Sequence, residues 1–301
     1  MSKKKKIIII AAVLLVVAAV ILIIVLKKSG KDSYRILKVF NVEGKANVNR
    51  EGVGDIEPYK NMVLKSGDDI TLETGTLIIQ ADNDKYIYLE EGTEIVLKAS
   101  GGKNDGKTSI DLKRGAITND IQEKLSDEEG YEVNTPNSTM SVYGTMFRVE
   151  VYEENGIKYT RVSVFDGEVA SYLVYKDGTK SDNEVRVEKD KEVIIYEDDT
   201  TTDYLFPPRD IDYSDLPDEL LELLKDAIEN GRDLLVTIEA IDKYLSGIVT
   251  VTFKYNGSVF GTQTIKKGEK VTEPSLAPAA SGSWDWDFSK PVNSDIEIEW
   301  K

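Results

Sequence analysis

Twenty consecutive apolar residues near the amino terminus constrain this chain more than any other feature. Residues 7–26 read IIIIAAVLLVVAAVILIIVL, without a charge or a hydroxyl group. A helix of this length spans about 30 Å, the thickness of the hydrocarbon core of a bilayer. We therefore predict a transmembrane helix that anchors the chain in a membrane lipid bilayer. The alternative is a signal peptide cleaved near Ser29 and Gly30, although the apolar region of such peptides is usually only about 7–15 residues long.

Lysines on both sides of the apolar run set its expected orientation. Lys and Arg are retained on the cytoplasmic side of a membrane, and the lysines at 3–6 with the terminal amine outweigh the three lysines that follow the run. The predicted topology is a cytoplasmic stub at 1–6, an uncleaved signal-anchor helix at 7–26 and an extracellular part at 29–301. The chain would be a single-pass bacterial surface protein in the cell membrane.

Charge and missing residue types exclude several classes of function. The chain has neither Cys nor His, so it can form no thiol nucleophile, no Ser-His-Asp triad, no disulfide and no ordinary zinc site. Six of the 38 Lys and Arg precede residue 29, and the remaining part has a net charge of −22 (32 − 54), which repels nucleic acids. Two carboxylates could hydrolyse a glycosidic bond, but the sequence selects no pair. We predict a protein that is not an enzyme, with no catalytic, cofactor-binding or metal-binding residues, no cofactor and no nucleic-acid partner.

Two kinds of segment imitate ligand-binding loops. GGKNDGKT at 101–108 fits the phosphate-binding pattern, but such a loop needs a helix directly after it. Because 108–115 alternates as a strand does, we predict a Gly-rich hairpin and no nucleotide. The acidic turns at 81–85 and 196–203 lack the length, the Gly and the terminal Glu of a calcium loop. We favour solvated turn acids there, with weak calcium binding as the alternative.

Apolar and polar residues alternate from residue 34 to 197, which predicts an all-β domain. The clearest predicted strands are 76–81, 86–91, 93–99 and 192–197. Hairpin turns are expected at four dipeptides, Asp105-Gly106, Asn155-Gly156, Asp166-Gly167 and Asp177-Gly178. One helix is expected inside this domain, at about 120–129.

The pattern changes after the β domain. A linker is expected at 198–213, where hydroxyls, acids and prolines cluster, followed by a short αα-hairpin at 214–246. Its first helix should have Ser214 or Asp215 as N-cap, and the second should run from about 237 to 246. Strand patterns return in a small module at 248–301.

The segment WDWDF in this last module carries three aromatic residues at alternate positions, Trp284, Trp286 and Phe288. In a strand they would share one face and form a candidate aromatic contact face for sugars. A module of about fifty residues also needs large side chains for its core, and we favour the core over the contact face.

Two stretches, YEVNTPNSTMSVYGTMFRVEVY and TRVSVFDGEVAS, resemble the FecR domain family. The matching positions are Thr135, Pro136, Gly144, Thr145, Phe147, Val149, Val164, Gly167 and Val169. The resemblance extends over about residues 36–175 and implies a sandwich or jelly-roll-like β domain. It also implies a sensor outside the cytoplasm whose separate cytosolic segment controls a sigma factor, and the stub at 1–6 is too short to be such a segment. We interpret the matching residues as structural: Gly144 permits a close approach of two chain segments, and Pro136 ends ladder pairing.

The terminal module resembles an internalin-type B-repeat, a small β-grasp-like unit of bacterial surface proteins. The resemblance rests on the Val-Thr-Phe start at 251–253, on Gly268 before Val271 and Pro274, and on the closing Ile-Glu-Trp strand. It implies a spacing or presenting role.

Mainly β architecture, a membrane anchor and missing catalytic residues favour a non-catalytic surface protein. Its exported FecR-like domain would act as a ligand-binding or scaffolding module for a cell-envelope polymer or protein. The alternative is a transmembrane signal-sensing regulator of the FecR type.

Overall fold

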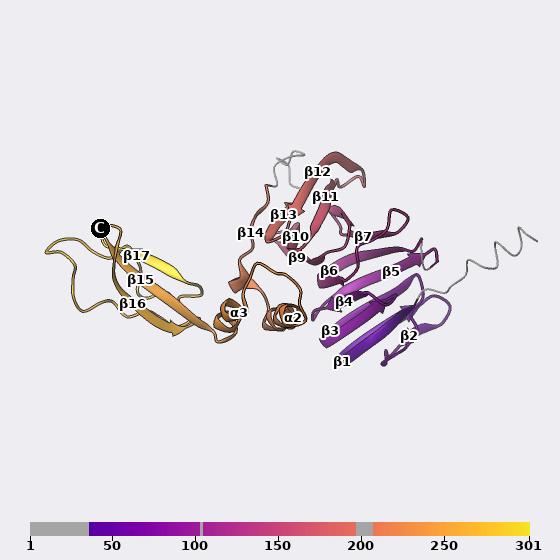
Figure 1. Ribbon diagram of the computed structural model, residues 1–301, viewed down its shortest axis with the longest axis horizontal. Helices are drawn as coiled ribbons and strands as arrows, with labels where there is room; N and C mark the ends of the chain where they lie inside the picture. Colours follow the sequence, from indigo (N-terminus) through magenta and orange to yellow (C-terminus); the bar gives the residue numbers. More distant parts are fainter. Residues whose placement is uncertain (1–35, 103–104, 197–206) are drawn as a thin grey trace, which may run out of the picture. The chain divides into compact units, whose positions relative to one another are not determined.

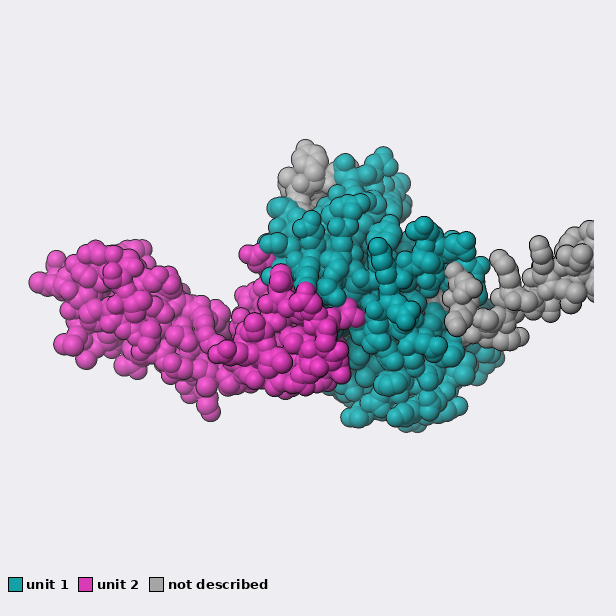
Figure 2. All heavy atoms as spheres, viewed as in Figure 1, with its two compact units in different colours: residues 1–209 teal, residues 210–301 magenta. Residues whose placement is uncertain are grey.

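A computed structural model describes residues 36–102, 105–196 and 207–301, and the protein is mainly β within these ranges (Figure 1). No helix in them is long and apolar enough to cross a bilayer. The predicted membrane helix at 7–26 lies outside the described residues. The chain divides after Arg209 into two compact units (Figure 2).

The first unit is a β-sandwich whose strands follow the predicted alternation. In chain order, its strands are β1 (Leu37–Arg50), β2 (Gly54–Ile56), β3 (Asp68–Ala81), β4 (Lys85–Leu89), β5 (Glu94–Ser100), β6 (Lys107–Ile121), β7 (Gly130–Asn134), β8 (Ser138–Val142), β9 (Met146–Glu154), β10 (Ile157–Asp166), β11 (Glu168–Val174), β12 (Lys180–Glu188), β13 (Lys191–Tyr196) and β14 (Arg209–Asp210).

Three long strands, β1, β3 and β6, pass from one sheet of the sandwich into the other. The first half of β6 pairs with β5 and, in parallel, with β7, whereas its second half pairs with β4 and β9. The first sheet therefore has the order β2-β1-β3-β5-β6-β7-β8-β11-β12. The second has the order β1-β3-β4-β6-β9-β10-β13-β14.

Glycines and one threonine make these crossings possible. Gly44 of β1 faces Gly75 of β3 with φ angles of 90° and 88°, and a Cβ on Gly75 would lie 2.2 Å from the carbonyl oxygen of Glu43. At the corresponding point of β6, the Thr93 hydroxyl donates to the carbonyl oxygen of Ala116 and accepts from its N–H. The carbonyl oxygen of Ala116 also accepts from the N–H of Glu90, so the backbone groups of β6 are satisfied at this point.

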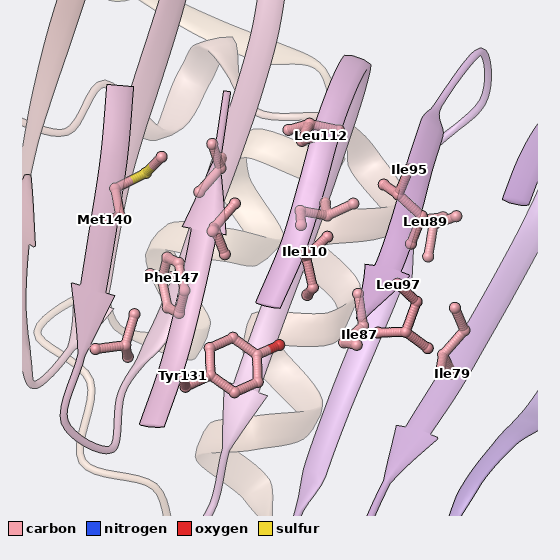
Figure 3. Packing of buried hydrophobic residues seen from close by; sticks show 14 of the residues in the cluster. Ile79, Ile87, Leu89, Ile95, Leu97, Ile110, Leu112, Tyr131, Met140 and Phe147 are labelled. Carbon is pink, nitrogen blue, oxygen red and sulfur yellow. The ribbon is translucent and has the colours of Figure 1, made fainter. Parts of the chain in front are cut away.

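The two sheets enclose one apolar core. Inward-facing Val, Ile and Leu residues from both sheets form a single buried cluster, part of which is drawn in Figure 3. One polar contact crosses it: the Tyr131 hydroxyl of β7 donates to Asn119 Oδ1 of β6 over 2.7 Å, and both residues are buried. At about 25 cal/mol per Å² of buried apolar surface, such a core is the main stabilising contribution to the domain.

Most predicted strands and turns of this domain are confirmed, and two predictions are wrong. Asn155 and Gly156 form the two-residue turn of the β9–β10 hairpin, with φ angles of 53° and 79°. The helix expected at 120–129 is absent from these residues: β6 continues to Ile121 and an irregular loop follows. Asp166-Gly167 does not close a hairpin, because β10 pairs with β9 and β13 while β11 pairs with β8 and β12. The chain changes sheet at this turn.

The second unit begins with the predicted helical hairpin. It consists of a short 3₁₀ turn, η1 (Tyr213–Asp215), and the helices α2 (Asp218–Glu229) and α3 (Ile238–Leu245). The first helix starts later than predicted, because Ser214 and Asp215 belong to η1 and Pro217 is the N-cap of α2. The second helix is capped by the Thr237 side chain, which accepts from the N–H of Ala240.

A small sheet completes the second unit. Its central strand β15 (Ile248–Tyr255) pairs antiparallel with β16 (Ser258–Lys266) and parallel with β17 (Ile296–Glu299). Apolar residues on the inner face, including Val251, Phe253 and Ile298, pack against side chains from the long segment between β16 and β17. The internalin-type assignment of this module stays a prediction.

The contact between Gly44 and Gly75 gives a first testable prediction. Gly75→Ala should lower the free energy of unfolding by about 3 kcal/mol, because the new methyl group meets a carbonyl oxygen and φ is positive. Gly156→Ala is the matched control, since it has a similar φ but open space around it, and it should cost about 1 kcal/mol. Urea unfolding of the full chain in detergent, followed by circular dichroism, measures both. Equal losses for the two variants would contradict the close approach.

Candidate functional site

The Thr-Pro positions of the FecR-like motif form the turn between β7 and β8, where they join the two sheets. Next to Thr135 and Pro136, the Asn137 side chain donates to the carbonyl oxygens of Lys158 (2.8 Å) and Ile195 (3.2 Å), which belong to β10 and β13 of the second sheet. Asn137 is 6% exposed, so these bonds form away from water. The turn therefore links one sheet to the other.

The Gly-Thr positions form a second structural cluster. Gly144 has a φ of 100°, and a Cβ there would lie 2.9 Å from the Cα of Lys124. A Cβ on Gly167 would lie 2.6 Å from the Thr145 side chain. Phe147 is completely buried in the core of the sandwich. The structure thus brings Gly144, Thr145 and Gly167 together and places Thr135 and Pro136 in a separate turn.

The three aromatic residues of the terminal module belong to its core cluster. Trp284 is 5% exposed, and its ring centroid lies 5.0 Å from that of Phe253 and 5.2 Å from that of Trp300. Trp286 and Phe288 are partly buried and pack against the same cluster. The segment is not a continuous strand, since Trp284 makes only an isolated bridge with Trp300. No common outward face results among these residues.

The loops considered for ions and phosphates have other contacts. In the turn at 81–85, the buried ammonium group of Lys85 lies 2.9 Å from Asp84 and 3.5 Å from Glu129, so a lysine already occupies the place of a cation between these acids. Most of the second acidic turn lies outside the described residues. The Gly-rich loop is followed by strand β6 and not by a helix, as predicted. Within the described ranges, no group of three or more acidic residues is placed to hold a metal ion.

The best candidate for a binding surface is the outer side of the second sheet, where alternate residues of β9, β10 and β13 point away from the core. We call this surface the Tyr–Arg face. Its members on these strands are Arg148, Glu150, Tyr152, Tyr159, Arg161 and Tyr196, the last of which also packs against the core cluster, and Glu90 joins them from the end of β4. The strand register places them in rows: Glu150 lies opposite Arg161, and Tyr152 opposite Tyr159, which in turn lies opposite Tyr196.

Arg148 is the charged centre of this face. Its guanidinium group donates two bonds to Glu90, of 2.7 and 2.9 Å, and one of 2.9 Å to Glu150. The arginine side chain is 5% exposed, whereas Glu90 and Glu150 are 26% and 28% exposed. Burial lowers the pKa of Arg148, but the two carboxylates outweigh this effect and raise it. The arginine remains charged, and the partly exposed carboxylates remain accessible to a partner.

Three tyrosines extend the face beyond the charges. The rings of Tyr152 and Tyr159 are stacked, with centroids 5.1 Å apart and planes at 9°, and Tyr196 lies 5.3 Å from Tyr159. All three are half-buried. Loss of contact with water is the main cause of a raised pKa for Tyr152, so its hydroxyl stays neutral at physiological pH.

This arrangement is suited to binding. Tyr and Arg are enriched among the residues that contribute most to protein–protein affinity, and aromatic pairs are worth about 0.5–1.5 kcal/mol beyond the area they bury. Arg148 and Arg161, whose Nε lies 4.0 Å from Glu150, together balance the charges of Glu90 and Glu150 within the domain. A partner that covers the face therefore meets no net charge from these four residues.

Our sequence analysis missed the Tyr–Arg face, although a signal was present. Because Asn155 and Gly156 form a two-residue turn, the residue numbers of two positions that face each other across β9 and β10 sum to 311, as for Glu154 and Ile157. Glu150 must then face Arg161, and Tyr152 must face Tyr159. The contribution of Glu90 comes from a distant part of the chain and has no comparable signal.

The chain resembles known proteins in one region. The FecR protein family matches residues 68–170, which run from the start of β3 into β11 and make up 103 of the 301 residues. No curated protein matches the chain.

Two crystal structures of proposed anti-sigma factors from Parabacteroides distasonis are similar to it. The first is 15% identical in sequence and has a TM-score of 0.39, and the match covers 51% of this chain and 64% of that structure. The second is 10% identical in sequence and has a TM-score of 0.38, and the match covers 77% of this chain and 98% of that structure. The chain thus spans less than two thirds of the first structure. Both TM-scores lie below 0.5, and this likeness does not establish a common fold.

The link through Asn137 gives a second prediction. Asn137→Ala removes both bonds to the second sheet, one of which, to the carbonyl oxygen of Ile195, is buried, so unfolding should become easier by about 2–3 kcal/mol. Asn134→Ala is the control, because Asn134 makes its bonds to Ser109 and Asp111 on the half-exposed outer side of the first sheet. It should cost less than about 1 kcal/mol. Urea unfolding measures the stability of both variants. An Asn137→Ala variant as stable as the wild type would show that the bonds of Asn137 do not hold the two sheets together.

A third prediction concerns Arg148. Replacing it by Met removes all three bonds to Glu90 and Glu150 and leaves only Arg161, 4.0 Å from Glu150, as a nearby cation, which should cost about 2–4 kcal/mol of stability at pH 7. Arg186→Met is the control: Arg186 also pairs with two glutamates, but its side chain is 61% exposed. Exposed ion pairs are worth about 0–1 kcal/mol. If both variants unfold at the same urea concentration, the ion pairs of Arg148 contribute no more to stability than the exposed pairs of Arg186.

Proposed function

We propose that this chain is a FecR-type signalling regulator, in which the β-sandwich receives a signal by binding a partner and catalyses no reaction. The observation that carries this proposal is the family match at 68–170. It lies on the strands that form the centre of the sandwich. Of the two functions expected from the sequence, the match favours the regulator over the scaffolding module.

The Tyr–Arg face is the surface on which we place the partner. It combines three tyrosines and a buried arginine whose glutamate partners are partly exposed. Interfaces between proteins concentrate their affinity in such residues. The partner in this proposal is a protein of the cell envelope.

A regulator of this kind must connect its sensor to the cytoplasm. In our proposal the apolar run at 7–26 crosses the membrane once, with residues 29–301 outside the cell. Its charge distribution and length support this topology. Binding to the sandwich would be transmitted by the anchor to a partner in or below the membrane.

A fourth prediction separates regulation from scaffolding. In cells that carry this chain, Tyr159→Ala should change the same set of transcripts as removal of the whole chain, because it opens the tyrosine row without touching the core. The control is Tyr172→Ala on β11, since the Tyr172 hydroxyl contacts Glu184 on the outer side of the first sheet. RNA sequencing of the strains compares them.

The outcomes distinguish the two functions. Regulation requires that chain removal and Tyr159→Ala give matching changes and that Tyr172→Ala resembles the wild type. If removal of the chain alters the cell envelope but leaves transcription unchanged, the regulator proposal is refuted and scaffolding is favoured.

A further inference from the structure

The start of β1 lies at an outer edge of the second sheet, together with the segment at 61–64. Three backbone hydrogen bonds join this segment to β1, and Val63 is paired with Lys38 across the contact. Residues paired in this way point to the same face of a sheet. Met62 and Leu64 on either side of Val63 are buried, so Val63 and Lys38 point outward.

Four large side chains are exposed at this edge, and we call them the apolar edge. They are Ile36, Phe40, Tyr59 and Val63, and their exposed fractions lie between 39% and 67%. The Phe40 ring contacts that of Tyr86 on β4, with centroids 5.3 Å apart, and Tyr59 belongs to the turn that leads into the segment at 61–64. Two distant parts of the sequence thus contribute to one exposed apolar surface.

The same two parts of the chain lack acidic residues. Residues 36–42 and 58–67 contain no Asp or Glu and carry Lys38, Lys60 and Lys65, in a chain with 54 acidic and 38 basic residues. Lys60 and Lys65 are exposed. The apolar edge is therefore accompanied by positive charge.

Acidic residues next to these segments are few or mostly buried. Asp68 is buried in an ion pair, and Asp82 is mostly buried and lies 3.9 Å from the ammonium group of Lys85. Glu43 and Glu57, at the ends of the two segments, are exposed. The three lysines outnumber these two glutamates.

We propose that the apolar edge rests on the surface of the bilayer that holds the chain's own apolar run, an inference that rests on the membrane topology proposed above. Nine residues, 27–35, separate the run from Ile36, so the start of β1 lies at most about 35 Å from the membrane. A tether this short keeps the bilayer at a high effective concentration, and a weak contact is then sufficient.

The composition of the edge fits a lipid surface. Aromatic residues are enriched at the boundary between hydrocarbon and water, where Tyr59 and Phe40 would lie in the proposed contact. Each lysine near an anionic membrane surface strengthens binding by about fivefold, which suits Lys38, Lys60 and Lys65.

This contact leaves the Tyr–Arg face free. In the second sheet, β3, β4 and β6 separate β1 from β9, a distance of four strand spacings or about 19 Å. The edge at β1 can therefore touch lipid while a protein partner binds to β9, β10 and β13.

Because the chain has no cysteine, a fluorophore can be attached at one chosen position. Tyr59→Cys places it in the apolar edge. Tyr143→Cys is the matched control, since the two tyrosines are 64% and 61% exposed and Tyr143 follows β8, five strand spacings or about 24 Å from β1 in the first sheet. The full chain would be reconstituted in vesicles of phosphatidylcholine and phosphatidylglycerol that contain a lipid with a nitroxide quencher close to its headgroup.

We expect severalfold stronger quenching at position 59 than at position 143. Equal quenching at both positions, in chains that stay in the vesicles after alkaline extraction, would overturn the docking and leave the anchor intact. Chains that alkali removes from the vesicles would refute the anchor, and the docking with it. The transcript comparison with Tyr159→Ala tests the regulatory function separately.

A charge reversal tests the role of the lysines. Added to Tyr59→Cys, Lys65→Glu should lower the ratio of docked to undocked domains by about fivefold or more, measured as a loss of quenching. Lys176→Glu is the control, because Lys176 is an exposed lysine in the turn between β11 and β12, and it should leave the quenching unchanged. Equal effects of the two reversals, or no effect of Lys65→Glu, would contradict docking at this edge.

Discussion

The close approach of β1 and β3 at Gly44 and Gly75 is the constraint on which the sandwich depends. Two paired strands can turn together from one sheet into the other only if their backbones come closer than a Cβ allows, and both glycines have positive φ angles. Every later strand is placed on this frame, because β4 and β5 pair with the two halves of β3. The sandwich is therefore one continuous sheet folded over its own core, and a change at the fold affects both layers.

Within this frame, two contacts of buried polar side chains connect the sheets. Tyr131 and Asn119 form a bond across the core, and Asn137 bonds to backbone oxygens of the opposite sheet. A buried polar group is costly when it lacks a partner, so each of these contacts penalises any shift of one layer against the other. A rigid sandwich of this kind can present a constant outer surface to a partner, as the Tyr–Arg face requires.

The sequence predicted the fold where local patterns decide it and failed where distant contacts do. Alternation gave the strands, and the dipeptide at Asn155 gave a hairpin with its register, because two-residue turns of this type match the twist of the strands. Asp166-Gly167 has the same local chemistry but connects two sheets, a choice that depends on the pairing of β10 with β13. The segment DIQEKLSDEE at 120–129 suggested a helix, but its first two residues belong to the C-terminal half of β6, which pairs with β4 and β9. For the binding surface, the Glu150–Arg161 and Tyr152–Tyr159 pairs followed from the register, whereas Glu90 joins them only through the packing of β4 beside β6.

The edges of both units limit pairing with other strands, and this bears on function. In the sandwich, the edge strands β2 and β14 are short, β12 is charged, and the edge that β1 forms in the second sheet is covered by the segment at 61–64. Pairing with other strands is thereby discouraged, and contacts are left to side chains on the sheet faces. In the small unit, β16 has nine residues and a single charge, and its edge is interrupted by a bulge at Phe260 and by the bond from the Lys266 N–H to Glu269. Side-chain contacts select a partner by shape and charge, whereas backbone pairing accepts any strand with suitable ends. In our proposal, recognition of a specific partner therefore belongs to the side chains on the faces of the sandwich.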